Sequence, residues 1–468
     1  MHRRLLLTLL PLVVLLTACP RSGPASEETA EPAAATAAEA AATANTESPW
    51  LRPAISLPAE HDGAALAWLQ HRAWPLADGA LDALVDHAAG HRAILLGEST
   101  HGTQEYYAKR AILTRRLVEQ GAIRFVAVEG DWSALAALDR VARGVDDTPV
   151  RDVMASFERW PVWMWANEPF AELVDWLRDW NADRPAEEQI RLHGVDVYDA
   201  GASGRRILAL VVPEAREDLF PCIGRYFGHF RAYAQAVGQA GLDCSEEVAA
   251  VQARLADGSL SLIDDADPAE ALFNARILAA SEHHHRAMAT EGGAASWNAR
   301  AGSFWTTFEA LLDHYGDDAA GVFWAHNTHV GDARATDMDN RGEVNIGQLA
   351  REALGDRVFV IGFAKRDGAV VAGERWGAIP RVMPVPAPMG GTWDEILAEV
   401  DAPQPWAVLF RGDDVPDALR IGRAQRAIGV MFSPAAGGAW VGTRLADRYD
   451  ALIVYGETTP LDAIPPIR

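Results

Sequence analysis

Short apolar runs of strand length recur along this chain, and segments with helical periodicity separate several of them. The runs cover residues 93–96, 124–128, 321–325, 357–362, 407–410, 427–432 and 451–455. Between the first two runs, residues 105–121 place Tyr106, Leu113 and Leu117 on one side and end at Gly121, as a helix does. Apolar strands that alternate with helices are typical of a parallel sheet covered on both faces. The sequence therefore predicts an α/β fold with a largely parallel sheet flanked by helices.

The N-terminus has the pattern of a secretory signal. Residues 1–19 begin with Arg3 and Arg4, continue with a short apolar run and end in Leu-Thr-Ala-Cys. These last four residues resemble a bacterial lipobox, in which Cys19 is lipidated and becomes the new N-terminus. The alternative is an ordinary signal peptide that is cut after Ala18. We expect a lipid-anchored protein of the bacterial cell envelope that faces the periplasm or the exterior.

Two further parts follow the signal. Residues 20–48 contain no Leu, Ile, Val or aromatic residue, so they cannot bury enough apolar surface to fold. They are predicted to form a disordered, Ala- and Glu-rich tether. Residues 49–468 are predicted to form the folded body, in which residues 202–315, approximately, make a mostly helical subdomain.

Charge limits the possible partners of the chain. The 65 acidic residues outnumber the 42 basic residues, and the formal net charge is -23. A nucleic-acid surface needs a basic footprint, and docking to anionic lipid also needs basic side chains. We therefore expect no nucleic-acid partner and no membrane contact other than the lipid anchor. Cys222 and Cys244 could form a disulfide outside the cytoplasm, but the sequence leaves this pairing and the oligomeric state open.

Four of the predicted strands end in ionisable residues. Glu98 and His101 follow the first strand, Glu129 and Asp131 the second, Asp196 and Asp199 the short run "IRLHGV", and His326, His329 and Asp332 the run 321–325. Parallel strands deliver the residues at their carboxyl ends to one edge of a sheet, where ligands bind. The sequence therefore predicts one shared site at that edge.

The chemistry of this predicted site is that of histidine and carboxylate. The chain has no G-x-S-x-G nucleophile elbow, no P-loop and no G-x-G-x-x-G motif, and no cysteine has a recognisable nucleophile context. A neutral imidazole takes a proton from water when a carboxylate holds its other ring nitrogen. Glu98 or Glu129 could do this for His101. His326 and His329 could hold the attacked carbonyl or protonate the leaving oxygen.

Two arginines and a histidine triplet complete the candidates. Arg110, in the helix after His101, and Arg300 could each stabilise an oxyanion or hold a carboxylate, and we place Asp196 with them in a substrate- and oxyanion-binding set. The same His and Glu residues are also a plausible zinc set, so a metal site stays open as the alternative. The triplet of residues 283–285 is expected at the surface, because adjacent helical residues diverge around the axis.

Several of these segments resemble motifs of the erythromycin esterase family. In order, they are "LLGESTHGTQEY", "FVAVEGDW", "WLRDWN", "HGVDVYD", "WNAR", "WAHNTHVGD" and "YDALIVYGETTP". The resemblance implies an α/β core with helical additions and metal-independent hydrolysis of a macrolide lactone ester, without a cofactor. It implies that His101 is the general base on water. Glu98, Glu129, Arg110, His326 and His329 match other active-site positions of the family, and Arg300 matches an arginine that is usually followed by Asp, where this chain has Ala301.

Three hypotheses of function follow. The first is a hydrolase that cleaves a carboxylic ester or a macrolide-type lactone with water activated by histidine and without metal, and that would confer macrolide resistance. The second is a metal-dependent hydrolase that uses the same cluster of His and Glu. The third is a lipoprotein that binds a ligand through these residues without catalysis.

Overall fold

The computed structural model describes residues 59–76, 79–227, 243–434 and 439–465, together with residues 233, 237 and 241. The predicted signal peptide, Cys19 and the tether lie outside the described residues. None of the described helices combines the length and the apolar character that crossing a bilayer requires.

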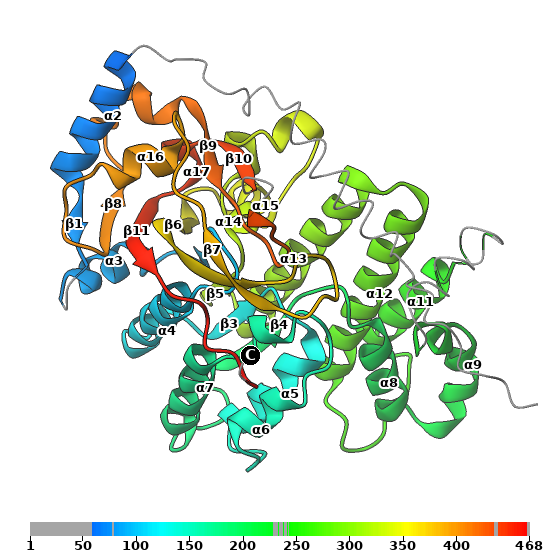
Figure 1. Cartoon of the computed structure of the whole chain (residues 1–468). Helices are drawn as coiled ribbons and strands as arrows, with labels where there is room; N and C mark the ends of the chain where they lie inside the picture. The colour runs from blue at the N-terminus through cyan, green and yellow to red at the C-terminus, as the bar shows by residue number, and fades with distance from the viewer. Residues whose placement is uncertain are drawn as a thin grey trace, which may run out of the picture.

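A nine-stranded sheet forms the centre of the described structure (Figure 1). Its strands lie in the order β1-β8-β11-β6-β2-β5-β3-β4, and β7 pairs with the far end of β6. The bounds are β1 Trp74–Pro75, β2 Ala93–Leu96, β3 Phe125–Val128, β4 Arg191–Gly194, β5 Gly321–Trp324, β6 Val358–Ala372, β7 Arg381–Val385, β8 Trp406–Leu409 and β11 Ala451–Thr458. The six strands from β11 to β4 run parallel. β8 is antiparallel to β11, β1 is antiparallel to β8, and β7 is antiparallel to β6. The predicted α/β fold with a largely parallel sheet is confirmed.

One predicted strand is wrong. Residues 427–432 form only isolated bridges, and the strand in this region is β9 (Gly422–Arg426), which pairs with β10 (Trp440–Arg444) in a separate two-stranded sheet. Ile428 and Phe432 are instead buried against apolar residues of β6 and β7. Their apolar character therefore reflects packing against the paired strands β6 and β7. Periodicity alone cannot distinguish such a packed segment from a strand.

Helices cover both faces of the sheet, and alternate residues of each strand point to opposite faces. Ile94 and Leu96 of β2 pack in one core with α3 (Ala80–Ala88), α4 (Gln104–Glu119), α5 (Trp132–Ala142) and α7 (Glu168–Asn181). Ala93 and Leu95 pack in a second core with α2 (Ala59–Arg72), α13 (Gly293–Tyr315), α15 (Ile346–Leu354) and α16 (Trp393–Ala398). Burial on both faces explains why the strands of the sheet centre are continuous apolar runs.

The described residues between 200 and 315 are mostly helical. They form α8 (Ala200–Leu210), α9 (Pro213–Ile223), α11 (Ser245–Ala256), α12 (Pro268–Thr290) and α13, and the first four lie together to one side of the sheet (Figure 1). These four helices share a small apolar core of their own. Cys222 and Cys244 are joined in a disulfide that links α9 to the start of α11.

The strand order also decides where the four ionisable strand ends lie. The strands β2, β5, β3 and β4 are adjacent and parallel in the sheet. Their carboxyl ends therefore open side by side at one edge, although the chain visits them far apart in sequence.

Candidate active site

The turn after β2 carries the first two site residues and depends on close backbone approaches. A Cβ on Gly97 would lie 2.1 Å from the side chain of Asn327, so the β2 and β5 ends can meet only at a glycine. Gly102 has a φ of 67° and approaches the backbone of Val371. The backbone N–H of Asn327 donates to the carbonyl of Glu98 at 2.7 Å, which ties the two strand ends together.

Glu98 holds His101 by one ring nitrogen. Its carboxylate is fully buried, with Oε1 2.8 Å from His101 Nδ1 and Oε2 3.0 Å from Arg110 Nη2. A carboxylate that accepts from a guanidinium on one oxygen also accepts on the other, so Nδ1 of His101 is the protonated nitrogen. Nε2 of His101, which has no hydrogen bond to a described residue, is therefore the ring nitrogen with the lone pair.

Arg110 donates to the carboxylate of Glu98 on the oxygen that His101 does not use. It has no exposed surface, and its guanidinium lies between the rings of Tyr107 and Trp324, at 4.3 and 4.8 Å. Of the two roles that the sequence allowed an arginine here, the geometry supports the holding of a carboxylate, because substrate cannot reach a guanidinium that is buried behind Glu98. The predicted contact of Arg110 with an oxyanion does not fit this position.

His326 differs from His101 in which ring nitrogen carries the proton. Its ring centroid lies 4.9 Å from that of His101. Its Nδ1 accepts from the backbone N–H of Thr328 at 3.2 Å and lies 2.8 Å from the Thr328 hydroxyl, which can donate to the same nitrogen. We therefore assign the proton of the neutral ring to Nε2. This Nε2 is buried and makes no hydrogen bond of normal geometry to a described residue, although the ring also interacts with the backbone of Ser99. Burial and the neighbouring His101 ring hold the pKa of His326 well below its ordinary value, which keeps the ring neutral.

Arg300, from α13, is the charged centre of the cluster. Its Nε and Nη2 donate to the two carboxylate oxygens of Asp196, both at 2.8 Å, and Nη2 also lies 2.8 Å from Glu129 Oε1. Burial alone would raise the pKa of Glu129, but His329 and Arg300 hold it well below its usual range. Arg300, with Arg159, likewise outweighs burial and lowers the pKa of Asp196. The two carboxylates therefore stay ionised at neutral pH. Both oxygens of Asp196 accept from Arg300, so Asp196 holds this arginine in place rather than binding a ligand.

His329 completes the cluster beside Arg300. Its ring stacks on Trp297 with a centroid distance of 4.7 Å and an angle of 7°. Its Nε2 lies 3.3 Å from both Glu129 Oε1 and Arg300 Nη1. Nε2 of the neutral ring can either donate to the carboxylate or accept from the guanidinium, depending on the tautomer.

A second carboxylate group lies next to Arg300. Asp131 accepts a hydrogen bond from the guanidinium of Arg159. Asp199 accepts a hydrogen bond from the backbone N–H of Ser133 at 2.7 Å. Burial and the nearby Asp131 carboxylate raise the pKa of Asp199 to about 6. Asp332, in contrast, pairs with Arg334 and is not one of the contacts of the cluster.

The predicted site residues come together with few exceptions. Glu98, His101, Glu129, Asp196, Arg300, His326 and His329 form one buried cluster, with Arg110 behind it, and Cys19 lies outside the described residues. Sequence reasoning missed Arg159, Tyr198 and Trp376. Arg159 follows no strand of the sheet. Tyr198 follows β4 and Trp376 follows β6, but neither carries the charge by which the other residues at strand ends stand out.

The histidine triplet is not a surface feature, so that prediction is wrong. Only His283 is exposed, whereas His284 is 3 % exposed and His285 is half-buried. His284 and His285 lie on the side of α12 that packs against the rest of the protein, and the ring of His284 lies 5.3 Å from that of Tyr198. The three rings do point in different directions around the helix axis, as expected. However, α12 packs against α8, α11 and α13, so two of the three rings are covered by neighbouring parts of the protein.

The described residues bring three or more possible metal-ligand atoms within 4.8 Å of one another at Cys222, Cys244 and Glu247, and the two cysteines are disulfide-bonded. The cluster of His, carboxylate and Arg at the strand ends is not such a group. Arg300 lies among its carboxylates and His329, where a shared cation would have to be.

Together, the fold and the site define a class of protein: an α/β protein with a buried cluster of His, carboxylate and Arg at the carboxyl edge of a parallel sheet. A model of the erythromycin esterase family matches residues 118–458, which is more than two thirds of the chain. The chain therefore belongs to the erythromycin esterase family, and membership implies a hydrolase of the esterase class. The match begins after His101, so it does not include the "GESTHG" turn.

Three solved structures share this fold. One is described as a succinoglycan biosynthesis protein (16 % identity, 86 % of this chain and 98 % of that chain, TM-score 0.71). Another is a Bacillus cereus protein (17 % identity, 86 % and 99 %, TM-score 0.70). The third is a mutant of the erythromycin esterase EreC in its open conformation (14 % identity, 81 % and 93 %, TM-score 0.57).

Proposed function

We propose that this protein hydrolyses a carboxylic ester or a macrolide-type lactone with water that His101 activates, without a metal ion. The observation that carries the proposal is the pair of neighbouring imidazoles with opposite hydrogen-bonding character. His101 offers a lone pair on Nε2, whereas His326 offers an N–H on its Nε2. Water and an ester carbonyl need these two groups, one to accept a proton and one to donate a hydrogen bond.

The reaction proceeds in two steps. His101 Nε2 takes a proton from water as the water oxygen bonds to the carbonyl carbon, and the resulting oxyanion accepts from His326 Nε2–H. The tetrahedral intermediate then collapses, its C–O bond to the alkoxy oxygen breaks, and the His101 imidazolium returns the proton to that oxygen. The Glu98 carboxylate stabilises the imidazolium between the steps, as the orienting carboxylate of a catalytic triad does. The products are a carboxylic acid and an alcohol, which stay joined when the substrate is a lactone.

Arg300 supports a reaction without metal. Its fixed charge already pairs with both Glu129 and Asp196, and its bidentate contact with Asp196 holds it in one orientation. A cation bound to Glu129 and His329 would displace the guanidinium from Glu129 and would lie next to its positive charge, which opposes the binding of the cation.

Replacement of His101 tests the general base. We expect His101→Ala to lower kcat by about 10²- to 10⁴-fold on any ester that the protein cleaves, because the proton acceptor for water is lost. A panel of macrolides of different ring size and of simple carboxylic esters, followed by mass spectrometry for the gain of one water, identifies the substrate.

The matched control is His87→Ala, which removes an exposed histidine from α3. It should keep full turnover. Turnover in His101→Ala close to that of the unaltered protein, with an unchanged circular dichroism spectrum, would contradict the assignment. Loss of activity with a chelator, restored by zinc, would favour the metal-dependent alternative. The lipid anchor at Cys19 and a role in macrolide resistance stay predictions.

A further inference from the structure

A cleft with a cavity volume of about 720 Å³ lies away from the catalytic cluster. It is bounded by α5, β4, α8, α12 and the end of α13, and no residue of the catalytic cluster lines it. Clefts of this size hold ligands of the size of a drug or a metabolite.

The floor of the cleft is a stack of aromatic rings. Trp132 stacks on His193 and on Phe273, with centroid distances of 5.3 and 5.2 Å and angles of 22° and 18°. His193 Nε2 lies 2.8 Å from the hydroxyl of Tyr315, and burial lowers the pKa of His193 to about 3. These rings pack on one another and expose only a small part of their surface to the cleft, with Trp132 and Phe273 each 6 % exposed. The floor is therefore aromatic, and His193 is uncharged at neutral pH.

Arginines dominate the charge of the lining. Among the described lining residues, five arginines (Arg140, Arg143, Arg191, Arg205 and Arg206) face three carboxylates (Asp139, Asp267 and Glu270). These residues carry a formal charge of +2, on a chain of charge -23. A positive cleft in so acidic a protein attracts anions locally.

The buried carboxylate of the lining is already satisfied. Asp139 is 4 % exposed and accepts from Arg143, Arg191 and the backbone N–H of Leu192. Glu270 pairs with Arg206 at the rim. Arg140 is exposed and forms no ion pair with a described residue, so its guanidinium is available at the mouth of the cleft.

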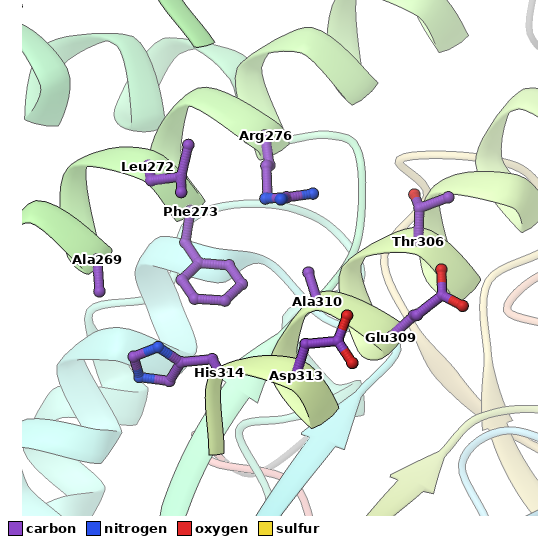
Figure 2. Close-up of a pocket in the computed structure, with 9 residues that line it drawn as sticks. All are labelled: Ala269, Leu272, Phe273, Arg276, Thr306, Glu309, Ala310, Asp313 and His314. Atoms are coloured by element: carbon purple, nitrogen blue, oxygen red, sulfur yellow. The ribbon is translucent and has the colours of Figure 1, made fainter. Parts of the chain in front are cut away.

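A neighbouring cavity shows that the positive charge belongs to the cleft and not to the whole region. Figure 2 shows this cavity, of about 480 Å³, between α12 and α13. It shares Phe273 and His314 with the cleft, but its charged residues are Arg276, Glu309 and Asp313, a formal charge of -1. Two adjoining cavities that share an aromatic wall therefore differ in the sign of their charge.

We propose that the arginine-lined cleft is a second ligand site, which binds a small organic anion with a carboxylate or phosphate group on a flat apolar body. The aromatic floor would bind the body of the ligand, and the rim guanidiniums would bind its anionic group in the paired geometry that carboxylate and phosphate share with Arg. This site is separate from the proposed ester site.

Isothermal titration calorimetry with three naphthalene ligands tests the proposal. We expect naphthoate or naphthyl phosphate to bind at least about tenfold more tightly than neutral naphthol, and to bind more weakly at high salt. Whichever anion binds more tightly identifies the anionic group. Arg140→Ala and Arg205→Ala should each weaken the binding about two- to fivefold, and Arg140→Glu combined with Arg205→Glu should abolish it.

Two controls separate this cleft from other surfaces. Arg276→Ala removes the same charge from the adjoining cavity and should change the affinity less than about twofold. His101→Ala should bind the anion unchanged, and Arg140→Ala should keep its circular dichroism spectrum and its ester turnover. Equal binding of naphthol, an effect of Arg276→Ala as large as that of Arg140→Ala, or loss of binding in His101→Ala would each overturn the second site.

Discussion

At the scale of single residues, the direction of each hydrogen bond decides the chemistry of the site. Glu98 lies between a guanidinium and an imidazole, so both of its oxygens accept, and His101 must donate through Nδ1. His326 accepts from a backbone N–H through Nδ1 and must therefore carry its proton on Nε2. Two identical side chains, with ring centroids 4.9 Å apart, have different roles because of what holds their Nδ1 atoms.

Replacement of Glu98 by glutamine should reverse the tautomer of His101. The NH₂ group of the introduced amide cannot face Arg110, which is itself a donor, so it turns toward His101 and donates to Nδ1. The proton of His101 then moves to Nε2, and the base is lost. We expect Glu98→Gln to lower kcat by about 10²- to 10⁴-fold with little change in KM, measured by steady-state kinetics.

The matched control for this substitution is Glu119→Gln, at the exposed end of α4. It should leave both kinetic constants unchanged. A Glu98→Gln protein that raises KM and keeps its kcat would show that Glu98 binds substrate and does not orient the base.

At the scale of elements, the loop between β6 and β7 brings an aromatic wall to the site. Trp376 of this loop lies 4.8 Å from Trp160 and 6.1 Å from Tyr198, measured between ring centroids. The indole N–H of Trp160 donates to the carbonyl of Ala378 at 3.0 Å, which fixes the loop. Tyr198 in turn lies 5.4 Å from the guanidinium of Arg300. The loop therefore adds aromatic rings next to the cluster of His, carboxylate and Arg, and under the proposed function these rings would contact an apolar part of the ester.

Removal of one ring of this wall should affect binding more than chemistry. We expect Trp376→Ala to raise KM about tenfold for an apolar ester and to change kcat less than about twofold, because truncation of a contact Trp costs more than about 1 kcal/mol. Michaelis–Menten kinetics on the best substrate of the panel measures both constants.

Trp180→Ala removes a tryptophan from the remote stacked pair of α7 and serves as the control. Its KM should equal that of the unaltered protein. An unchanged KM in Trp376→Ala would show that the wall lies outside the path of the substrate.

At the scale of the whole molecule, buried neutral histidines make the fold sensitive to acid. Burial lowers the pKa of His193 and His285 to about 3 and that of His284 to about 4, and it also lowers the pKa of His91 and His326. The unfolded chain therefore binds more protons than the folded chain below the ordinary histidine pKa of 6.5. Asp199 acts in the opposite direction, because its pKa is raised to about 6 in the folded protein.

We expect the free energy of unfolding to fall as the pH drops below 6.5, by about 1.4 kcal/mol per pH unit for each such histidine. Urea denaturation at a series of pH values measures this slope. His193→Gln, whose side chain does not titrate, should reduce the slope by about one proton down to pH 3. His87→Gln, at an exposed position, should not change it. Equal slopes for the unaltered protein and His193→Gln would contradict the linkage.

Much of the fold could be predicted because its cause is local. Strands such as residues 93–96 and 451–455 are apolar on both faces, and the helix after His101 shows its buried side and its stop in the sequence. Residues 427–432 could not be assigned in this way, since Ile428 and Phe432 are buried against β6 and β7, which lie much earlier in the chain.

The sequence by itself determined which residues would meet at the site, because parallel strands deliver their carboxyl ends to one edge and Glu98, His101, Glu129, Asp196, His326 and His329 all follow strands. The tertiary structure decided what those residues do. Arg300 pairs with Asp196, which is 104 residues away in the chain. Only the folded structure shows that Arg300 lies among the carboxylates of the site and that Arg110 instead binds Glu98 on the side away from it. The same holds for the arginine-lined cleft, since its charge comes from separate helices and a strand. Strand ends follow from local pattern, whereas hydrogen-bond direction and charge balance depend on neighbours that only folding supplies.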